Sequence, residues 1–212
     1  MDIYERIEEL KVVPVVVIDD EKDAVDLAKA LCDGGLPIAE VTFRTQAAKG
    51  AIEKISKEVP DMLVGAGTIL SIEQAKSAID AGAKFIVSPG FDEKVVDYCI
   101  SENVPVFPGC ITPTEIIKAM NMGLKIVKFF PAEQFGGVNT IKALAAPFKD
   151  MKFMPTGGIS LDNLKDYLSV NSVVACGGSY MVKKDWIKAG DFEKITEITK
   201  TTVCRANWVD RK

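Results

Sequence analysis

The feature that most constrains the fold is the regular recurrence of short apolar runs along the chain. These runs are rich in β-branched and aromatic residues, recur at a spacing of roughly 20–25 residues, and are each followed by a segment of helical periodicity. They span residues 12–18, 38–43, 63–67, 85–89, 105–109, 126–131, 152–157 and 173–178. Strands that alternate with helices in this way form βαβ units, so the pattern predicts an α/β protein with a parallel sheet.

The number of runs predicts a barrel. Eight βα units within 212 residues fit a single (β/α)₈ TIM barrel over residues 1–212, near the small end of the size range of that fold. An amphipathic segment from about Asp2 to Lys11 adds an N-terminal helix before the first strand. An open doubly wound sheet is the alternative, although it usually has fewer strands in this length, and the first run lacks the GxGxxG fingerprint. No linker or change of composition divides the chain.

Helix-start signals precede several of the helical segments. Ser71 with Gln74 and Thr112 with Glu115 have the spacing of capping boxes, and Pro113 follows Thr112 at the first helical position. Further N-caps are expected at three polar residues, Thr45, Asp92 and Ser160.

Charge and composition exclude some classes of partner. The net charge is −4, with acids and bases mixed along the chain, and no basic tract predicts binding to nucleic acid. The N-terminal MDIYERIEEL is acidic rather than basic and then apolar, so it does not resemble a signal peptide. The apolar runs are too short to cross a bilayer, and no membrane partner is expected.

The cysteines and histidines narrow the chemistry further. Five scattered cysteines without a CxxC motif argue against a disulfide framework or a zinc site, and a cytoplasmic location is expected. The chain contains no histidine, which excludes Ser–His and Cys–His nucleophile pairs and every metal site that uses histidine. Any general base must therefore be a carboxylate, a lysine, a tyrosine or a cysteine.

Lys128 is the most informative candidate. Residues 126–133 read IVKFFPAE, and Lys128 is the only one of the 22 lysines at the centre of an expected strand. An isolated ammonium ion is costly in an apolar interior, which favours the neutral amine. A neutral amine is a nucleophile that attacks a carbonyl carbon and forms an imine, so Lys128 is the predicted catalytic nucleophile.

Glu40 is the predicted proton shuttle for that chemistry. Glu40, Thr42 and Arg44 stand at i, i+2 and i+4, so an extended strand points all three to one face. A carboxylate beside Lys128 can move protons during imine formation. The alternative is a buried Lys128–Glu40 pair with a structural role only, although such pairs are often no more stabilising than apolar residues.

Anion-binding groups follow other expected strands. Arg44 offers a bidentate fork for a carboxylate or phosphate, and the hydroxyls of Thr68 and Thr156 are candidates for the same anion. Either threonine alone also fits a cap or turn.

Two diglycines follow the seventh and eighth runs, where barrels frequently bind phosphate. Gly157–Gly158 follows Thr156, and Gly177–Gly178 precedes Ser179. Glycine lets backbone amides approach a phosphate closely. Pro89 and Phe130 also lie at the ends of runs, where rigid strand exit and packing are the alternative interpretations.

Several blocks together resemble the 2-keto-3-deoxy-6-phosphogluconate and 4-hydroxy-2-oxoglutarate aldolase family. The blocks occur in order and cover most of the chain: IAEVTFRT (38–45), VGAGT (64–68), SPG (88–90), PVFPG (105–109), IVKFFPAE (126–133), PTGGI (155–159) and GGS (177–179). The first and the IVKFFPAE block are specific, whereas GAGT and GGI alone are weak.

The resemblance implies a role for each candidate residue. Lys128 would form the Schiff base with pyruvate, and Glu40 would be the general acid and base. Arg44, Thr68 and Thr156 would hold the pyruvate carboxylate, with Pro89 and Phe130 lining the pocket. Gly158 and Ser179 would form the phosphate end, to which the diglycine that begins at Gly157 would contribute backbone amides. The resemblance also implies a homotrimer, no metal and no cofactor.

One departure concerns the phosphate. Some relatives carry an arginine near the end of the first strand, where this chain has Val17. Phosphate binding would then rest on the diglycine amides and Ser179. The expected substrate is a small 2-keto acid, and 2-keto-3-deoxy-6-phosphogluconate is the preferred candidate. 4-Hydroxy-2-oxoglutarate and the galactonate epimer are alternatives with the same mechanism.

Other functions fit less of the pattern. A phosphosugar isomerase or epimerase, or a non-catalytic phosphometabolite-binding barrel, would explain the diglycines but not Lys128 with Glu40. A zinc-dependent aldolase is disfavoured because histidine is absent.

Overall fold

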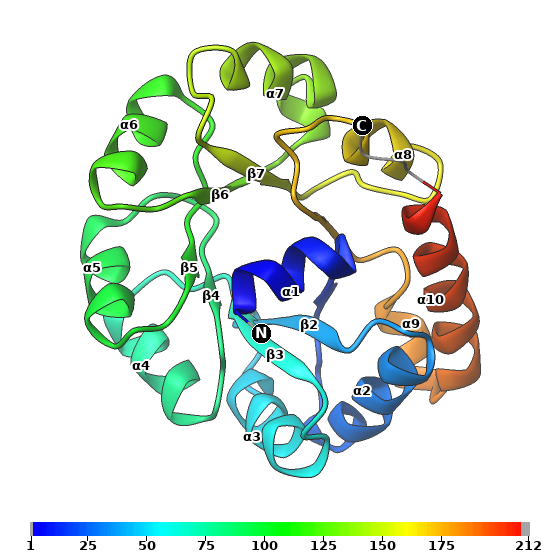
Figure 1. Cartoon of the computed structure of the whole chain (residues 1–212). Helices are drawn as coiled ribbons and strands as arrows, with labels where there is room; N and C mark the ends of the chain where they lie inside the picture. The colour runs from blue at the N-terminus through cyan, green and yellow to red at the C-terminus, as the bar shows by residue number, and fades with distance from the viewer. Residues whose placement is uncertain (1, 209–212) are drawn as a thin grey trace.

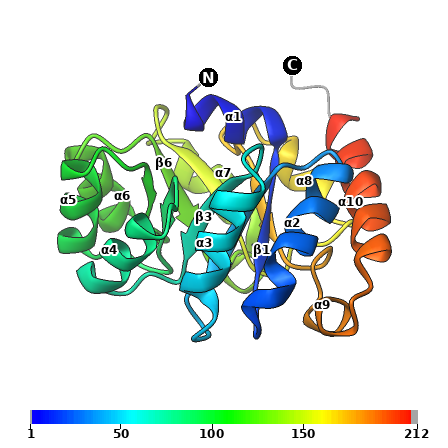
Figure 2. The same cartoon turned by 90° about the horizontal axis from the view of Figure 1, so that it is seen from below.

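The fold is an α/β structure in which a curled parallel sheet is surrounded by helices. The computed structural model describes residues 2–208 and is shown along and across the sheet axis in Figures 1 and 2. Within these residues the strands are β1 (Val12–Val16), β2 (Ile38–Thr42), β3 (Leu63–Gly67), β4 (Ile86–Val87), β5 (Val106–Phe107), β6 (Ile126–Phe129), β7 (Lys152–Pro155) and β8 (Cys176–Gly178). Each of the eight expected runs therefore contains a strand, and the predicted order of strands is confirmed.

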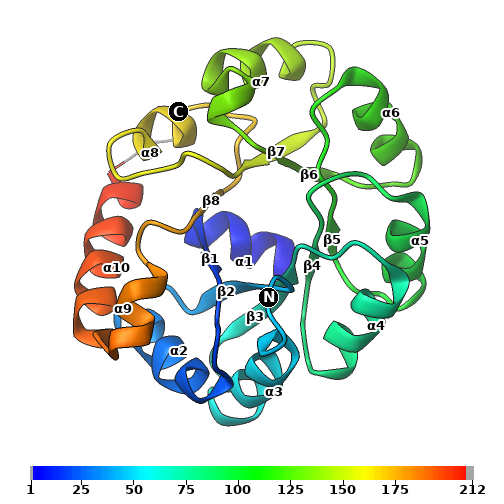
Figure 3. The same ribbon diagram turned by 180° about the vertical axis from the view of Figure 1, so that it is seen from behind.

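Helices α2 to α10 follow the strands along the chain and lie outside them, whereas α1 lies across the centre of the view (Figure 3). In chain order they are α1 (Ile3–Leu10), α2 (Ala24–Asp33), α3 (Ala48–Glu58), α4 (Ile72–Asp80), α5 (Glu93–Ser101), α6 (Pro113–Asn121), α7 (Gly137–Ala145), α8 (Leu164–Leu168), α9 (Lys184–Ala189) and α10 (Phe192–Asn207), with short 3₁₀ turns η1 (Glu21–Asp23) and η2 (Glu133–Phe135). None of the helices between residues 2 and 208 is both long enough and apolar enough to cross a bilayer.

Hydrogen bonding divides the strands into two ladders rather than one. Six strands pair in the order β5-β4-β3-β2-β1-β8, and β6 pairs with β7. Isolated parallel bridges connect the two groups: Gly109 with Lys128, Phe153 with Val173, and Thr156 with Gly177. The described residues thus form a curled parallel sheet with a continuous ladder over six strands, beside the separate β6–β7 pair.

Prolines explain why the ladders at β4 and β5 are short. The runs 85–89 and 105–109 were expected as five-residue strands, but only Ile86–Val87 and Val106–Phe107 are paired as strands. Pro89, Pro105 and Pro108 flank these pairs and have no amide hydrogen to donate to a neighbouring strand.

The N-terminal helix α1 covers one end of the sheet (Figures 1 and 2). Asp2 caps it in a capping box with Glu5, Ile7 is fully buried, and the ring of Tyr4 packs edge-on against Phe107 at 5.7 Å. The expected extra helix is therefore confirmed. Helix α1 occupies the end where the strands begin, so it does not cover the opposite end, where the loops that follow the strands lie.

The expected helix caps were partly correct. Thr112 and Glu115 form the capping box of α6, and Asp92 caps α5 through the amide of Val95. Ser71 caps α4, but Gln74 accepts from the amide of Leu70 instead of completing a box.

The cap expected at Thr45 was wrong, and the cap expected at Ser160 lies one turn before the start of its helix. Helix α3 begins at Ala48, and the hydroxyl of Thr45 donates to the carbonyl of Ile18, two residues after the end of β1. Helix α8 begins only at Leu164, and the amide of Ser160 donates to the side chain of Asn163. The Thr45 hydroxyl is therefore engaged in a tertiary contact, whereas the Ser160 hydroxyl accepts from the amide of Asp162 and caps the turn 161–163 that leads into α8.

Candidate active site

Lys128 and Glu40 form a buried pair across the sheet interior. Lys128 lies in β6 and Glu40 in β2, and their side chains are 5% and 1% exposed. Lys128 Nζ donates to Glu40 Oε1 at 3.2 Å and lies 5.2 Å from the centre of the Phe130 ring. Two residues 88 positions apart are thus brought into direct contact where a proton can pass between them.

Gly67 creates the space that Glu40 occupies. In the β2–β3 register Gly67 pairs with Thr42, and a Cβ atom at Gly67 would lie 2.0 Å from Glu40 Oε1. The sequence interpretation missed this residue, although a glycine inside an apolar strand signals a close approach of another group. The Glu40 carboxylate therefore lies over β3 because that strand presents no side chain there.

Two polar side-chain atoms of the site are buried and unpaired. Within residues 2–208, Glu40 Oε2 and Thr156 Oγ1 have no hydrogen-bond partner. Thr156 follows β7 and is 6% exposed, and a Cβ atom at Gly177 would lie 2.3 Å from its Oγ1. Because buried polar groups are normally satisfied, these two atoms are available to bind a substrate.

Arg44 and Thr68 meet at the rim of the site. Arg44 Nε donates to Thr68 Oγ1 at 3.3 Å. The reasoning that placed Arg44 on an extended strand was wrong, because β2 ends at Thr42 and Arg44 lies exposed in the turn that follows. Thr68 has a φ of 59°, which is uncommon for a β-branched residue and typical of functional loops.

The other expected residues occupy the same end of the sheet. Phe130 and Pro89 are half-buried in the segments after β6 and β4, and Gly157, Gly158 and Ser179 follow β7 and β8 at partly or fully exposed positions. Pro89 is held close to the next loop, because a Cβ atom at Gly109 would lie 2.1 Å from the Pro89 carbonyl oxygen.

Val17 lies beside an ion pair on the surface. It lines a small surface pocket together with Asp19 and Lys184, and Lys184 Nζ is 2.8 Å from Asp19 Oδ2. The end of β1 therefore supplies no arginine for a phosphate.

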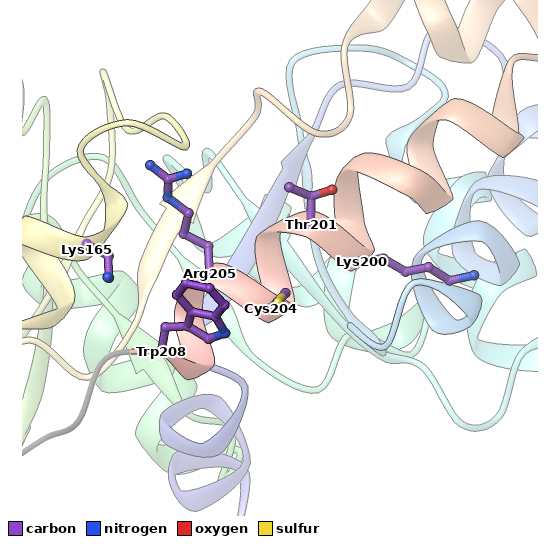
Figure 4. Close-up of a pocket in the computed structure, with 6 residues that line it drawn as sticks. All are labelled: Lys165, Lys200, Thr201, Cys204, Arg205 and Trp208. Atoms are coloured by element: carbon purple, nitrogen blue, oxygen red, sulfur yellow. The ribbon is translucent and has the colours of Figure 1, made fainter.

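A larger surface pocket is separate from this site. It has a volume of about 640 Å³ and is formed by α8, α10 and Trp208, with none of the expected site residues in its wall (Figure 4). No cluster of three or more cysteine, aspartate or glutamate side chains suited to a metal ion occurs in the part of the chain that the structure describes.

The fold and the buried pair define the class: an α/β protein with an amine and a carboxylate in contact where the loops after parallel strands meet. The family model for KDPG and KHG aldolases matches residues 3–198. The 2-dehydro-3-deoxy-phosphogluconate aldolase of Treponema pallidum is 48% identical over 201 residues, covering 95% of this chain and 96% of its own. The KHG/KDPG aldolase of Escherichia coli K12 is 45% identical over 192 residues, covering 91% and 90%.

Solved structures agree with the sequence comparisons. The KDPG aldolase of Legionella pneumophila, captured with pyruvate as a covalent carbinolamine intermediate, has a TM-score of 0.92 and 36% identity, covering 95% of this chain and 98% of its own. The chain belongs to the KDPG and KHG aldolase family, a family of carbon–carbon lyases.

Proposed function

We propose that this chain is a class I aldolase that cleaves 2-keto-3-deoxy-6-phosphogluconate (KDPG) to pyruvate and D-glyceraldehyde 3-phosphate. The observation that carries the proposal is the buried contact between Lys128 Nζ and Glu40 Oε1 at 3.2 Å. The family relatives named for this activity support the choice of substrate.

Imine formation begins with a proton transfer within the pair. When Lys128 gives a proton to Glu40, its neutral nitrogen attacks the C2 ketone and forms a carbinolamine. Glu40 then returns a proton to the carbinolamine hydroxyl, which leaves as water, and a protonated imine remains. The relative captured as a carbinolamine with pyruvate supports this step.

Cleavage uses the protonated imine as an electron sink. The C4 hydroxyl loses its proton to Glu40, the C3–C4 bond breaks, and its electrons flow into the imine to give an enamine and an aldehyde. Glu40 then protonates C3, and water hydrolyses the imine to release pyruvate. No histidine is needed, because the single carboxylate moves each proton in turn.

The anionic ends of the substrate determine its orientation. Arg44, with Thr68 and the unpaired hydroxyl of Thr156, binds the C1 carboxylate. The backbone amides of Gly157 and Gly158, together with Ser179, bind the phosphate. Pro89 and Phe130 line the space between them.

A second candidate is the same reaction on 4-hydroxy-2-oxoglutarate. It is favoured by Val17, which stands near the end of β1 where some relatives carry an arginine for the phosphate, and by the Asp19–Lys184 ion pair beside it. The galactonate epimer of KDPG is a further alternative with the same chemistry. Measuring kcat/KM for the three substrates separates them, because a dedicated phosphate site gives a large preference for the phosphorylated pair.

We also propose the architecture and setting of the enzyme. The isolated bridges between the two ladders support one closed (β/α)₈ barrel. Exposed apolar side chains on α6 and η2 support the homotrimer implied by the family resemblance. None of the five cysteines, all of which lie within the described residues, forms a disulfide, which supports a cytoplasmic location.

Borohydride trapping tests the chemistry directly. Incubation with pyruvate and borohydride is expected to give a stable adduct on Lys128, located by mass spectrometry of peptides. Lys128→Ala should form no adduct and lose KDPG cleavage by about a thousandfold or more, whereas Lys125→Ala, an exposed neighbour, should behave as the wild type. Adduct formation elsewhere, or an active Lys128→Ala variant, would contradict the mechanism and return the buried pair to a structural role.

A further inference from the structure

The loop after β7 has the hydrogen-bonding pattern of an anion site. The carbonyls of Thr156, Gly157 and Gly158 accept hydrogen bonds from Ala132 N (2.8 Å), Glu133 N (3.2 Å) and Asn163 Nδ2 (2.9 Å). Among the described residues, no acceptor is found for the amides of Gly157 and Gly158. Their φ angles of 98° and 77° are the left-handed conformation that only glycine adopts easily. The loop thus has fixed carbonyls and free amides.

Glu133 contacts this loop through both its backbone and its side chain. Its amide binds the Gly157 carbonyl, and its side chain packs so closely on Gly158 that a Cβ atom there would lie 2.3 Å from Glu133 Cγ. Glu133 belongs to the IVKFFPAE block, directly after the segment that carries Lys128. Residues 126–133 therefore carry the nucleophile Lys128 and, five residues later, the glutamate that contacts the diglycine.

Tyr167 fixes the Glu133 side chain. Tyr167 lies in α8, is 1% exposed, and donates its hydroxyl hydrogen to Glu133 Oε1. Gly137 leaves room for the hydroxyl, because a Cβ atom at that position would lie 2.9 Å from it. Burial, and secondly the hydrogen bond to Glu133, raise the pKa of Tyr167, so its neutral form donates throughout the physiological range.

We propose that Glu133 and Tyr167 are positioning residues for the phosphate-binding loop, and that they determine the preference for phosphorylated over unphosphorylated 2-keto acids. The inference rests on the proposed aldolase function. Neither side chain reaches the reacting carbons in this scheme; they act by holding Gly157 and Gly158 in the conformation that exposes the amides. Loss of the support should weaken binding of the phosphate and leave the imine chemistry unchanged.

The test compares two substrates in matched variants. KM and kcat are measured for KDPG and for 4-hydroxy-2-oxoglutarate in the wild type and in Glu133→Ala, Glu133→Gln and Tyr167→Phe. Gln134→Ala is the control, because Gln134 is the exposed neighbour of Glu133 on the same 3₁₀ turn. Borohydride trapping with pyruvate and the melting temperature are recorded for each protein.

The expected result is a selective change in KM. Glu133→Ala should raise the KM for KDPG about tenfold, with kcat and both constants for 4-hydroxy-2-oxoglutarate within about twofold of the wild type. Tyr167→Phe should show a smaller change in the same direction. Glu133→Gln keeps the side-chain stem and an acceptor for Tyr167, so it should restore nearly the wild-type KM.

Other results would overturn the inference. Equal changes for both substrates, or a lower kcat with normal KM, would mean that the pair supports the fold or the chemistry in general. If Glu133→Ala does not fold, an unchanged KM ratio in Tyr167→Phe contradicts the proposal. If the wild type traps pyruvate and prefers KDPG but the variants keep the same KM ratio, this inference is wrong and the proposed function stands. If the wild type neither traps pyruvate nor cleaves KDPG, the proposed function is wrong as well.

Discussion

At the scale of single residues, the candidate site depends on a missing side chain as much as on the charged ones. Gly67 has an ordinary φ angle, so its role is to leave space and not to allow an unusual backbone. The Glu40 carboxylate fills that space and thereby reaches Lys128. A methyl group added at Gly67 is therefore a selective way to move the carboxylate.

Gly67→Ala is expected to reduce kcat for KDPG cleavage about a hundredfold, because the new Cβ atom displaces Glu40 from Lys128 by rotating a flexible side chain. Pyruvate trapping should slow in parallel, and the melting temperature should change little. Gly90→Ala is the matched control, since a Cβ atom there meets nothing within 4 Å. Normal kcat in Gly67→Ala would show that the position of Glu40 is not critical.

The buried thiols give a second prediction at this scale. Burial raises the pKa of Cys99 to about 11, and burial followed by the charge of Glu115 raises that of Cys110 to about 12. Both stay protonated at pH 8, so a thiol reagent should label the exposed Cys204 first. Cys204→Ser should remove the fast phase, and rapid labelling of Cys110 would contradict the structure.

The same two thiols make stability depend on alkaline pH. Their folded pKa values lie above the value of about 8.5 for an unfolded thiol. This contribution to the free energy of unfolding is therefore complete below about pH 8.5 and declines as the pH rises toward 12.

The sequence predicted some residues of the site much better than others, for a physical reason. Lys128 was visible because a charge inside an apolar run is costly wherever the run folds. The functions of Gly67 and Tyr167 were not visible, because each depends on which residue of another element lies opposite. Glu133 was noticed only as part of a family block, and its contact with Gly158 appears only in the folded chain.

At the scale of the elements, the α6 capping box shows how local sequence sets a boundary. Glu115 accepts hydrogen bonds from the amides of Ile111 and Thr112 and from the Thr112 hydroxyl, at 2.8–2.9 Å. Partial burial acts to raise the pKa of Glu115, but these hydrogen bonds outweigh it and lower the pKa.

Glu115→Ala is expected to lower the free energy of unfolding by about 1 kcal/mol at pH 7, as for a lost cap, with unchanged activity. Because the folded pKa of Glu115 is depressed, its contribution is present above the unfolded pKa and is lost as the pH falls through the lower folded value. Denaturant unfolding at pH 7 and below pH 4 should therefore show the wild type and the variant converging in acid. A constant difference at both pH values would assign the effect to packing.

Elements whose ends depend on tertiary contacts were less predictable. Thr112 and Glu115 are three residues apart, and their reciprocal bonds need no other part of the chain. Thr45 has an equally suitable side chain, but the Ile18 carbonyl, two residues after the end of β1, competes for it. Pro89 was expected as a rigid strand exit, yet the extent to which prolines shorten the ladders at β4 and β5 is fixed only by pairing.

At the scale of the whole molecule, apolar side chains on the outer surface remain to be explained. Ile117 and Met120 on α6 are 49% and 39% exposed, and Phe135 in η2 is 47% exposed. Large exposed apolar side chains that lie near each other are typical of a protein–protein interface. Helices α6 and α7 are neighbours on the outside of the sheet (Figure 1), and η2 leads into α7 along the chain.

The proposed homotrimer gives the last prediction. Light scattering after size exclusion should give three times the 23.0 kDa mass of the chain. Ile117→Glu combined with Met120→Glu should shift the mass to that of one chain, because charges are costly to bury in an interface. Changing the exposed Leu70 to Glu is the control, since Leu70 lies on another part of the surface, before α4. A wild type with the mass of one chain would contradict the trimer. A double variant that stays trimeric would place the interface elsewhere. A monomeric variant that still traps pyruvate would show that each chain carries a complete site.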